Sequence, residues 1–303
     1  MSNFAGVFIT NERMNPTIPY SIRVGGRLMD LSTPKVMGIL NVTPDSFYAD
    51  SRKQSEADIA RRVEQIMDEG GDIIDVGAYS SRPGAADVTA QEEMERLARA
   101  LRIIRRLAPG AVVSIDTFRT GVARCCVEDY GAHIINDISG GEMDADMFST
   151  VASLQVPYIL MHMQGTPQTM QSQPSYQDVV IEVMQSLGKR ASLLHEMGVC
   201  DVILDPGFGF GKTLQHNYQL LSRLSQLHEL HLPLLVGVSR KSMIYNLLGC
   251  TPQEALGGTT VVHTIALLQG AHILRVHDVK AATEAVRIVR QTLQPDIIPS
   301  KNR

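Results

Sequence analysis

The chain has 303 residues, of which 44% are apolar and 20% charged, a composition typical of a soluble globular protein. Its formal net charge of -4 excludes the basic footprint that nucleic acid or an anionic membrane would need, so we expect neither as a partner. The four cysteines form no C-x-x-C pair and residues 1–15 lack a signal-peptide pattern, which together favour a cytoplasmic location.

In chain order, residues 1–33 predict a short N-terminal extension, with Val24-Gly25-Gly26-Arg27 as the turn of a hairpin. From residue 34 to residue 295, short apolar runs alternate with longer amphipathic segments, and residues 296–303 form a tail. The apolar runs predict eight strands, at residues 36–40, 72–76, 112–115, 134–135, 158–160, 202–204, 234–236 and 273–276. Because such alternation is typical of βα units, the pattern predicts an α/β fold, a TIM (β/α)8 barrel in a single domain.

The segments between these runs have the periodicity of amphipathic helices. In residues 92–107, apolar side chains recur every three or four positions, with glutamates and arginines between them. Pro109-Gly110 is expected to end this helix. Residues 177–197 and 281–293 repeat the pattern. The longest apolar stretch, residues 261–276, is interrupted by polar side chains and so falls short of a membrane span.

Side chains suited to binding follow the predicted strands, where a parallel barrel places its ligand site. They are Asn41, Asp75, Asp116, Asn136 with Asp137, Met161 with His162, Asp205, Ser239-Arg240-Lys241 and Arg275-Val276-His277-Asp278. Asp116, Asn136 and Asp205 offer acceptors to the N–H donors of an amino-pyrimidinone ring. Lys241 and Arg275 suit carbonyl and phosphate oxygens, so the set predicts a flat heterocycle joined to phosphate. Asp75 keeps two interpretations, a ligand contact or a role inside the barrel without one.

Residues 205–212 form a glycine-rich stretch after the sixth predicted strand, Asp205-Pro-Gly-Phe-Gly-Phe-Gly-Lys212. Its two interpretations are a phosphate-binding P-loop and the polar end of a barrel strand. A P-loop needs glycine where Pro206 stands, which favours the strand end. We therefore interpret Lys212 as a loop or surface cation and not as a phosphate ligand.

Several long motifs resemble the dihydropteroate synthase family, and together they cover about residues 34–293. They are Met37-Gly-Ile-Leu-Asn41-Val-Thr-Pro-Asp-Ser-Phe47, Ser80-Ser-Arg-Pro-Gly84, Ser114-Ile-Asp116-Thr, Ile135-Asn136-Asp-Ile, Leu160-Met161-His-Met, Asp205-Pro-Gly-Phe-Gly-Phe-Gly, Gly237-Val-Ser-Arg-Lys241-Ser and Arg275-Val-His277-Asp. The resemblance implies a TIM barrel, usually a homodimer, and a target of sulfonamides. It also implies a transferase that condenses 6-hydroxymethyl-7,8-dihydropterin diphosphate with 4-aminobenzoate to give 7,8-dihydropteroate and pyrophosphate, with Mg2+ assisting the leaving group.

The resemblance also assigns roles to residues of this chain. The pterin pocket would contain Asp116, Asn136, Met161, Asp205, Phe210, Gly237, Lys241 and Arg275. The diphosphate would be held by Asn41, Arg82, Arg275 and His277, and Asn41 would also bind the metal. The aminobenzoate would contact Ser81, Arg82, Pro83 and Ser242. Ser242 begins a predicted helix, whose N-terminal amides favour a carboxylate. The expected catalytic residues are Lys241, Arg275, His277 and Asp50.

The implied mechanism needs no nucleophilic side chain. Pyrophosphate leaves the pterin methylene, a delocalised cation forms, and the neutral arylamine attacks it, while surrounding charges stabilise the departing anion. Two loops depart from the family pattern. Ser81 stands where most members have threonine, and residues 48–52 replace a Ser-Asp-Gly-Gly run, which displaces the loop aspartate that steadies the cation by one position, to Asp50.

Two other functions compete with this interpretation. A methyltetrahydrofolate:corrinoid methyltransferase would share the ring-binding carboxylates and amide, and an inactive paralogue would bind pterin without turnover. The presence of Lys241, Arg275 and Arg82 favours the synthase, because a methyl donor carries no diphosphate and an inactive relative does not need to keep them.

Overall fold

The computed structural model describes residues 19–42, 49–79, 88–166, 168–170 and 174–296, with backbone only for residues 49–55. Eight parallel strands form one sheet in the order β8-β7-β6-β5-β4-β3-β10-β9. They are β3 (Lys35–Asn41), β4 (Ile73–Gly77), β5 (Val112–Asp116), β6 (Ile134–Asp137), β7 (Tyr158–Met161), β8 (Val202–Asp205), β9 (Leu235–Val236) and β10 (Ile273–Val276). A parallel bridge between Leu204 and Leu234 joins the two outer strands, so the sheet closes into the predicted TIM barrel.

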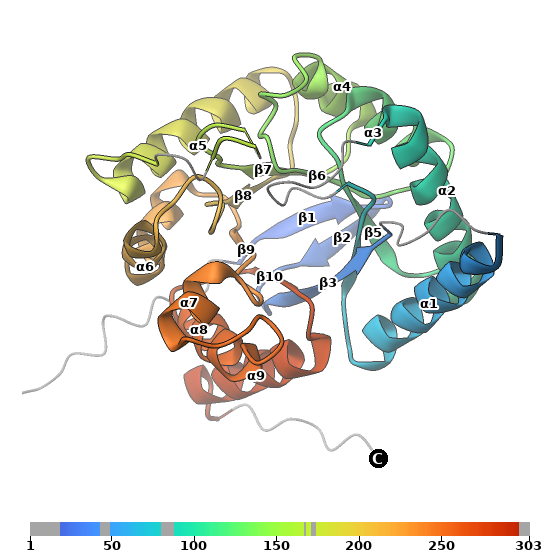
Figure 1. Cartoon of the computed structure of the whole chain (residues 1–303). Helices are drawn as coiled ribbons and strands as arrows, with labels where there is room; N and C mark the ends of the chain where they lie inside the picture. The colour runs from blue at the N-terminus through green and yellow to red at the C-terminus, as the bar shows by residue number, and fades with distance from the viewer. Residues whose placement is uncertain (1–18, 43–48, 80–87, 167, 171–173, 297–303) are drawn as a thin grey trace, which may run out of the picture.

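Helices surround the strands (Figure 1). They are α1 (Ala49–Asp68), α2 (Ala90–Leu107), α3 (Thr120–Glu128), α4 (Met147–Leu154), α5 (Val179–Glu196), α6 (Leu214–Ser222), α7 (Ser242–Leu248), α8 (Leu256–Leu268) and α9 (Val279–Leu293), with a short 3-10 helix η1 (Leu224–Leu230). Helix α2 shows why these segments fold: Thr89 accepts a hydrogen bond from the amide of Glu92 at its start, and Leu97, Leu101 and Ile104 are buried along one face. None of the helices in the described ranges is long and apolar enough to span a bilayer.

A hairpin of β1 (Ser21–Val24) and β2 (Arg27–Asp30) precedes the barrel and lies across it in Figure 1. Gly25 and Gly26 have φ angles of 55° and 77°, the left-handed pair that a tight two-residue hairpin turn requires. Ile22 and Val24 are buried in one cluster with residues near the starts of the barrel strands, among them Ile73. The hairpin therefore covers the amino-terminal end of the barrel and leaves the carboxyl end to the site.

Alternation along the strands places the site above this apolar layer. In a strand, residues two positions apart face the same side. The apolar cluster under the hairpin contains Ile73, Ile134, Ile159, Ile203, Leu235 and Ile273. Two positions further along the chain, in the same order, stand Asp75, Asn136, Met161, Asp205, Gly237 and Arg275. The same strands thus supply an apolar floor and, one layer higher, most of the predicted pterin pocket.

Candidate active site

Arg275 of β10 joins its own strand to β4 and β5 at the carboxyl end of the barrel, and β6 joins them through Asp75. Its Nε donates to Asp75 Oδ2 at 2.6 Å and its Nη2 donates to Asp116 Oδ2 at 2.7 Å. Asn136 Nδ2 also donates to Asp75, at 3.3 and 3.2 Å to the two carboxylate oxygens. Asp75 is fully buried behind the other three, and its contacts hold Arg275 and Asn136 in place. Of its two interpretations, the structure supports a role inside the barrel.

Burial and neighbouring charges shift the pKa values of the charged groups in this cluster. Burial raises the pKa of Asp116, although Arg275 opposes this, and burial likewise raises the pKa of Asp205, against the effect of Lys241. Burial lowers the pKa of Lys241 to about 8, with Asp205 acting in the opposite sense. Burial also acts to lower the pKa of Arg275, but Asp75 and Asp116 outweigh it, so the guanidinium stays charged. The site therefore contains two cations, Arg275 and Lys241, and the carboxyl groups of three aspartates in surroundings largely screened from water. The aspartates are Asp75, Asp116 and Asp205.

The loop after β8 closes one side of the cluster. Asp205 Oδ1 accepts a hydrogen bond from the amide of Gly207 at 2.7 Å. Lys241 donates to the carbonyl of Phe208, and its Nζ lies 4.5 Å from the centre of the Phe210 ring. Phe210 packs against the buried apolar cluster that contains Met161. The predicted pterin residues from β7, β8 and the start of α7 are therefore neighbours in the structure.

Gly237 keeps this space open. A Cβ built at Gly237 would lie 3.9 Å from Asp205 Oδ2 and 3.9 Å from the Cβ and Cδ atoms of Arg275. Any longer side chain at this position would therefore extend toward both charged groups. The small residue predicted from the sequence accordingly leaves room between them.

Lys212 lies in the loop between β8 and α6, which agrees with its interpretation as a loop cation, but it is buried, so the alternative of a surface cation is wrong. Its Nζ donates to the carbonyls of Gly207 at 3.0 Å and Phe210 at 3.1 Å, and it lies 3.0 Å from His162 Nδ1. Burial lowers the pKa of Lys212 to about 7. Positive φ angles at Gly207, Gly209 and Gly211 allow the loop to turn its carbonyls around the ammonium. The glycines thus surround a cation of the chain itself and do not form a phosphate cradle.

His277 follows β10 and is held by its neighbours. Ser239 Oγ accepts a hydrogen bond from the His277 amide at 3.1 Å and lies 3.1 Å from His277 Nδ1. Arg62 Nη2 donates to the His277 carbonyl at 2.6 Å, and Arg62 Nε donates to the carbonyl of Ile39 at 3.2 Å. Burial and the nearby Arg275 lower the pKa of His277 to about 4, so the imidazole is neutral at pH 7.

The remaining predicted residues are placed as follows. Asn41 is the exposed last residue of β3, and Ser242, half-buried, is the first residue of α7. The side chain of Asp50, and the whole of Ser81, Arg82 and Pro83, lie outside the described residues. The structure therefore leaves the predicted contacts of these four residues as predictions.

The end of β3 offers one side-chain oxygen, that of Asn41, of the kind that Mg2+ binds. Within the described ranges, no group of three or more His, Cys, Asp and Glu residues is arranged to hold a metal. Mg2+ does not need one, because it keeps several waters and commonly binds through one or two protein oxygens plus substrate phosphates. The exposed carboxamide oxygen of Asn41 suits that role.

Two arginines hold the stems of the chain on either side of residues 80–87. Arg96 Nη1 donates to the carbonyl of Ala78 at 3.0 Å, and Arg119 Nη2 donates to the carbonyl of Val88 at 2.6 Å. Arg119 also pairs with Glu93, which is fully buried and accepts from Thr117 Oγ1 at 2.7 Å. Arg96, Arg119 and Glu93 were not among the predicted site residues. A glutamate in the first turn of an amphipathic helix, such as Glu93, usually indicates an exposed charge.

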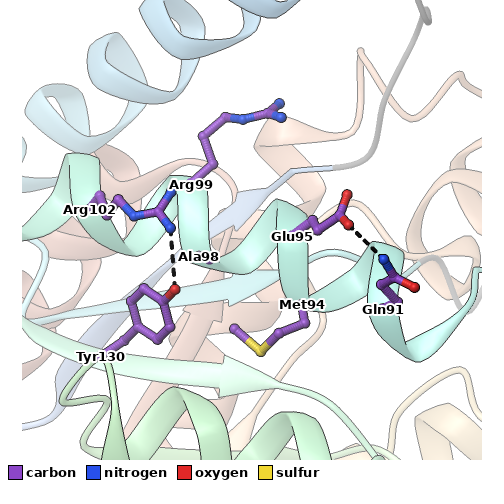
Figure 2. Close-up of a pocket in the computed structure, with 7 residues that line it drawn as sticks. All are labelled: Gln91, Met94, Glu95, Ala98, Arg99, Arg102 and Tyr130. Carbon is purple, nitrogen blue, oxygen red and sulfur yellow. Dashed lines mark hydrogen bonds between the residues drawn. The ribbon is translucent and has the colours of Figure 1, made fainter.

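A groove is lined by one face of α2 and by Tyr130, which follows α3 (Figure 2). Its lining is Gln91, Met94, Glu95, Ala98, Arg99, Arg102 and Tyr130. Tyr130 accepts a hydrogen bond from Arg102 at 3.3 Å across it. The groove shares no residue with the cluster around Arg275.

The chain is similar to known proteins over most of its length. Residues 37–277 match the family model of pterin binding enzymes. Dihydropteroate synthase of Escherichia coli (strain K12) is 46% identical over 270 residues, which cover 88% of this chain and 95% of the relative. The chain belongs to the dihydropteroate synthase family. All of the predicted site residues fall within the matched residues 37–277.

Solved dihydropteroate synthases have the same fold. A structure of the Yersinia pestis dihydropteroate synthase with a sulfonamide drug complex superimposes with a TM-score of 0.81 at 40% identity, covering 91% of this chain and 100% of that one. The Thermus thermophilus dihydropteroate synthase in complex with 4-aminobenzoate gives a TM-score of 0.78 at 37% identity, covering 89% of this chain and 99% of that one. The barrel is therefore a dihydropteroate synthase barrel.

Proposed function

We propose that the cluster around Arg275 is the active site at which this chain carries out the dihydropteroate synthase reaction. That reaction condenses 6-hydroxymethyl-7,8-dihydropterin diphosphate with 4-aminobenzoate to give 7,8-dihydropteroate and pyrophosphate. The observation that carries the assignment is one guanidinium bound to carboxylates of β4 and β5, beside an amide of β6. Such a set combines acceptors for ring N–H groups with a fixed cation for the diphosphate.

The ring would lie between the acceptors and the apolar wall. Asn136 uses its Nδ2 on Asp75, so its Oδ1 is the atom that would accept from the pterin, together with Asp116 and Asp205. Lys241 would donate to the ring acceptors. Met161 and Phe210 would contact the ring faces, and the guanidinium plane of Arg275 would stack on the pterin. The geometry supports this arrangement because these side chains converge at one end of the barrel.

The diphosphate would lie above Arg275, toward the ends of β3 and β10. His277 is neutral at pH 7, so it would donate one N–H to a phosphate oxygen and add no charge of its own. Asn41 would hold Mg2+, which when bound supplies positive charge to the leaving diphosphate. Arg82 would supply a second guanidinium from its loop.

The aminobenzoate would enter between the loops. Ser81, Arg82 and Pro83 would contact it from one side, and Ser242 would bind its carboxylate from the other. Ser81 supports this assignment because it keeps the hydroxyl of the threonine that most family members have. The Yersinia pestis dihydropteroate synthase was solved with a sulfonamide drug complex, and we propose that such drugs bind this chain at the position of the aminobenzoate.

The chemical step would use arranged charge and no covalent enzyme intermediate. The C–O bond between the pterin methylene and the diphosphate breaks, and its electrons leave with pyrophosphate. The neutral amine of aminobenzoate then forms the new C–N bond and loses a proton. Arg275, Lys241 and His277 would stabilise the departing anion, while Asp50 would steady the cation. Exclusion of water by the surrounding loops would prevent hydrolysis of that cation.

Pyrophosphate release measures this function directly. Purified protein with the pterin diphosphate, 4-aminobenzoate and Mg2+ is expected to release pyrophosphate, and release is expected to depend on 4-aminobenzoate. Release without 4-aminobenzoate would indicate hydrolysis of the pterin diphosphate. No release under any condition would contradict the proposed function.

We also infer a homodimer in the cytoplasm, with residues 34–295 as the pterin-binding domain. Val261, Ile265 and Leu268 of α8 are exposed, and so are Leu247 and Leu248 of α7, a helix that packs against α8. Exposed apolar side chains on two neighbouring helices favour association with a second copy. The four free cysteines support a reducing compartment.

A further inference from the structure

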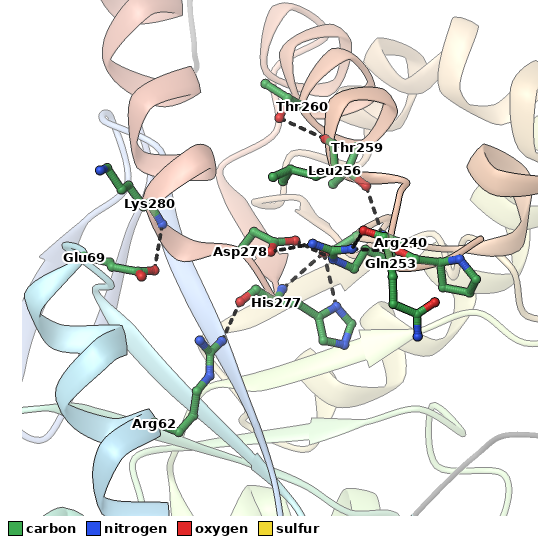
Figure 3. A network of polar contacts seen from close by, with 12 residues as sticks. Arg62, Glu69, Arg240, Gln253, Leu256, Thr259, Thr260, His277, Asp278 and Lys280 are labelled. Atoms are coloured by element: carbon green, nitrogen blue, oxygen red, sulfur yellow. Dashed lines mark hydrogen bonds and ion pairs between the residues drawn. The ribbon is translucent and has the colours of Figure 1, made fainter. Parts of the chain in front are cut away.

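Two neighbouring loops at the active-site end of the barrel are joined by an ion pair. Arg240, in the turn between β9 and α7, donates from Nε to Asp278 Oδ2 at 2.8 Å and from Nη2 to Asp278 Oδ1 at 2.9 Å. Its Nη1 donates to the carbonyls of Pro252 at 2.7 Å and Gln253 at 2.6 Å, in the loop before α8 (Figure 3). Four hydrogen bonds thus connect the β9 turn, the start of α9 and the loop before α8.

The backbone of Arg240 adds a second observation. Its φ angle of 53° lies in the left-handed region of backbone conformation, which residues other than glycine and asparagine rarely adopt. The amide of Arg240 donates to Thr259 Oγ1 of α8 at 3.1 Å. A non-glycine residue stays in such a conformation only where its surroundings hold it there, and such residues cluster at functional sites.

Each partner of the ion pair is next in the chain to a proposed catalytic residue. Lys241 follows Arg240, and His277 precedes Asp278. The residue before Arg240 is Ser239, whose Oγ contacts both the amide and Nδ1 of His277. The two loops are therefore paired residue by residue, Ser239 with His277 and Arg240 with Asp278. Lys241 follows this pairing as the N-cap residue of α7.

We propose that Arg240 and Asp278 are positioning residues for the synthase reaction, which orient Lys241 and His277 toward the substrate without touching it. The inference rests on the proposed function of the site. A direct role of Arg240 in binding an anion is disfavoured, because four of its five N–H donors already bond to Asp278, Pro252 and Gln253. Asp278 is engaged through both oxygens by the same guanidinium.

The test compares Arg240→Gln, Asp278→Asn and the double variant in the pyrophosphate-release assay. Each single variant is expected to lower kcat by about tenfold to a hundredfold, because a displacement of about 1 Å in catalytic groups has effects of that size. The KM for 4-aminobenzoate is expected to change much less. The double variant is expected to lose no more than the worse single variant, because the two residues act as one unit.

Arg223→Gln is the matched control. Arg223 pairs with Asp178 at 2.9 Å, and Asp178 occupies the N-cap of α5 as Asp278 occupies the N-cap of α9. The Arg223→Gln substitution removes an Arg–Asp pair of the same barrel, and neither residue of that pair is next to a proposed catalytic residue. The kcat of this variant is therefore expected to stay within about twofold of the wild-type value.

Arg240→Gly separates positioning from folding. Glycine accepts a φ of 53° without strain but lacks the guanidinium, so this variant is expected to unfold at higher urea concentration than Arg240→Gln while its kcat stays as low. Rates are expressed per folded protein, measured by circular dichroism. Wild-type kcat in folded Arg240→Gly or Asp278→Asn would overturn the positioning role. Absence of pyrophosphate release by the wild type would instead overturn the proposed function.

Discussion

Replacement of Arg275 by leucine tests the buried charge cluster. Arg275 binds Asp75 at 2.6 Å and Asp116 at 2.7 Å, and the three side chains are 20%, 0% and 20% exposed. Removal of one member of a buried pair costs about 3–5 kcal/mol, because the remaining charge has lost its partner in a poorly solvated place. Here two carboxylates remain, so we expect the Arg275→Leu variant to lose about 3–5 kcal/mol of unfolding free energy at pH 7 and all measurable turnover.

The loss should depend on pH with a defined sign. Burial raises the pKa of Asp116 to about 7 even with Arg275 present, and loss of that cation raises it further. A carboxyl whose pKa is higher in the folded state binds its proton there first, so its contribution to stability is present at low pH and is lost as pH rises through the folded pKa. The deficit of the variant is therefore expected to be largest above pH 7 and to shrink as the pH falls toward 5.

A second substitution separates stability from activity. In the Arg275→Leu background, Asp75→Asn removes one of the two like charges, so we expect it to recover at least half of the lost stability while turnover stays absent. The chain has no tryptophan, so urea unfolding is followed by circular dichroism. Arg223→Leu is the control for loss of a half-exposed ion pair. If the unfolding free energy of Arg275→Leu stays within about 1 kcal/mol of the wild-type value, the buried ion pairs do not stabilise the fold as argued. Near-normal turnover of this variant would contradict a catalytic role of Arg275.

Three further substitutions address other groups. Lys241→Ala should abolish pyrophosphate release, because the pterin ring and the Phe208 carbonyl lose the ammonium group that donates to them. A near-normal rate would contradict the assignment of Lys241 as a catalytic residue. Burial lowers the pKa of His263 to about 4, so the unfolded chain binds a proton at this side chain more readily than the folded protein does. Between pH 7 and pH 5 the wild type should therefore lose about 2 kcal/mol more unfolding free energy than His263→Leu. Equal shifts of the urea midpoint in the two proteins would contradict this effect of His263. Lys212→Met leaves the Gly207 and Phe210 carbonyls without their hydrogen-bond donor. The KM for the pterin substrate should then rise about tenfold, and the backbone amides of this loop should exchange their hydrogens faster. Unchanged hydrogen exchange would contradict the role of Lys212 in holding the loop.

Much of the fold follows from local patterns. Eight apolar runs with amphipathic segments between them predicted the barrel, and the structure confirms each strand to within one or two residues at its ends. The Gly25-Gly26 turn was also predicted, because two adjacent glycines between two short strands specify a tight hairpin. Strand ends indicated the site because parallel strands in a barrel all point to one edge.

The contacts that orient the site were not predictable from the sequence. Arg275 and Asp75 are separated by 200 positions, and Arg240 and Asp278 by 38, so nothing local marks them as partners. Lys212 shows the same difference, since a lysine at the end of a glycine loop suggests exposure. Its burial depends on carbonyls that only the folded loop turns inward.

Spacing along the chain was enough to predict the periodicity of the barrel and the residues at its ligand edge, because both depend only on the order of residues. The tertiary structure decided which of those residues face one another. It made Asp75 a support for Arg275 and Asn136, turned Lys212 inward, and joined the β9 and β10 loops through Arg240 and Asp278. The physical reason is that the partners of a buried charge are set by the closing of the sheet, which brings together residues that are distant in the chain.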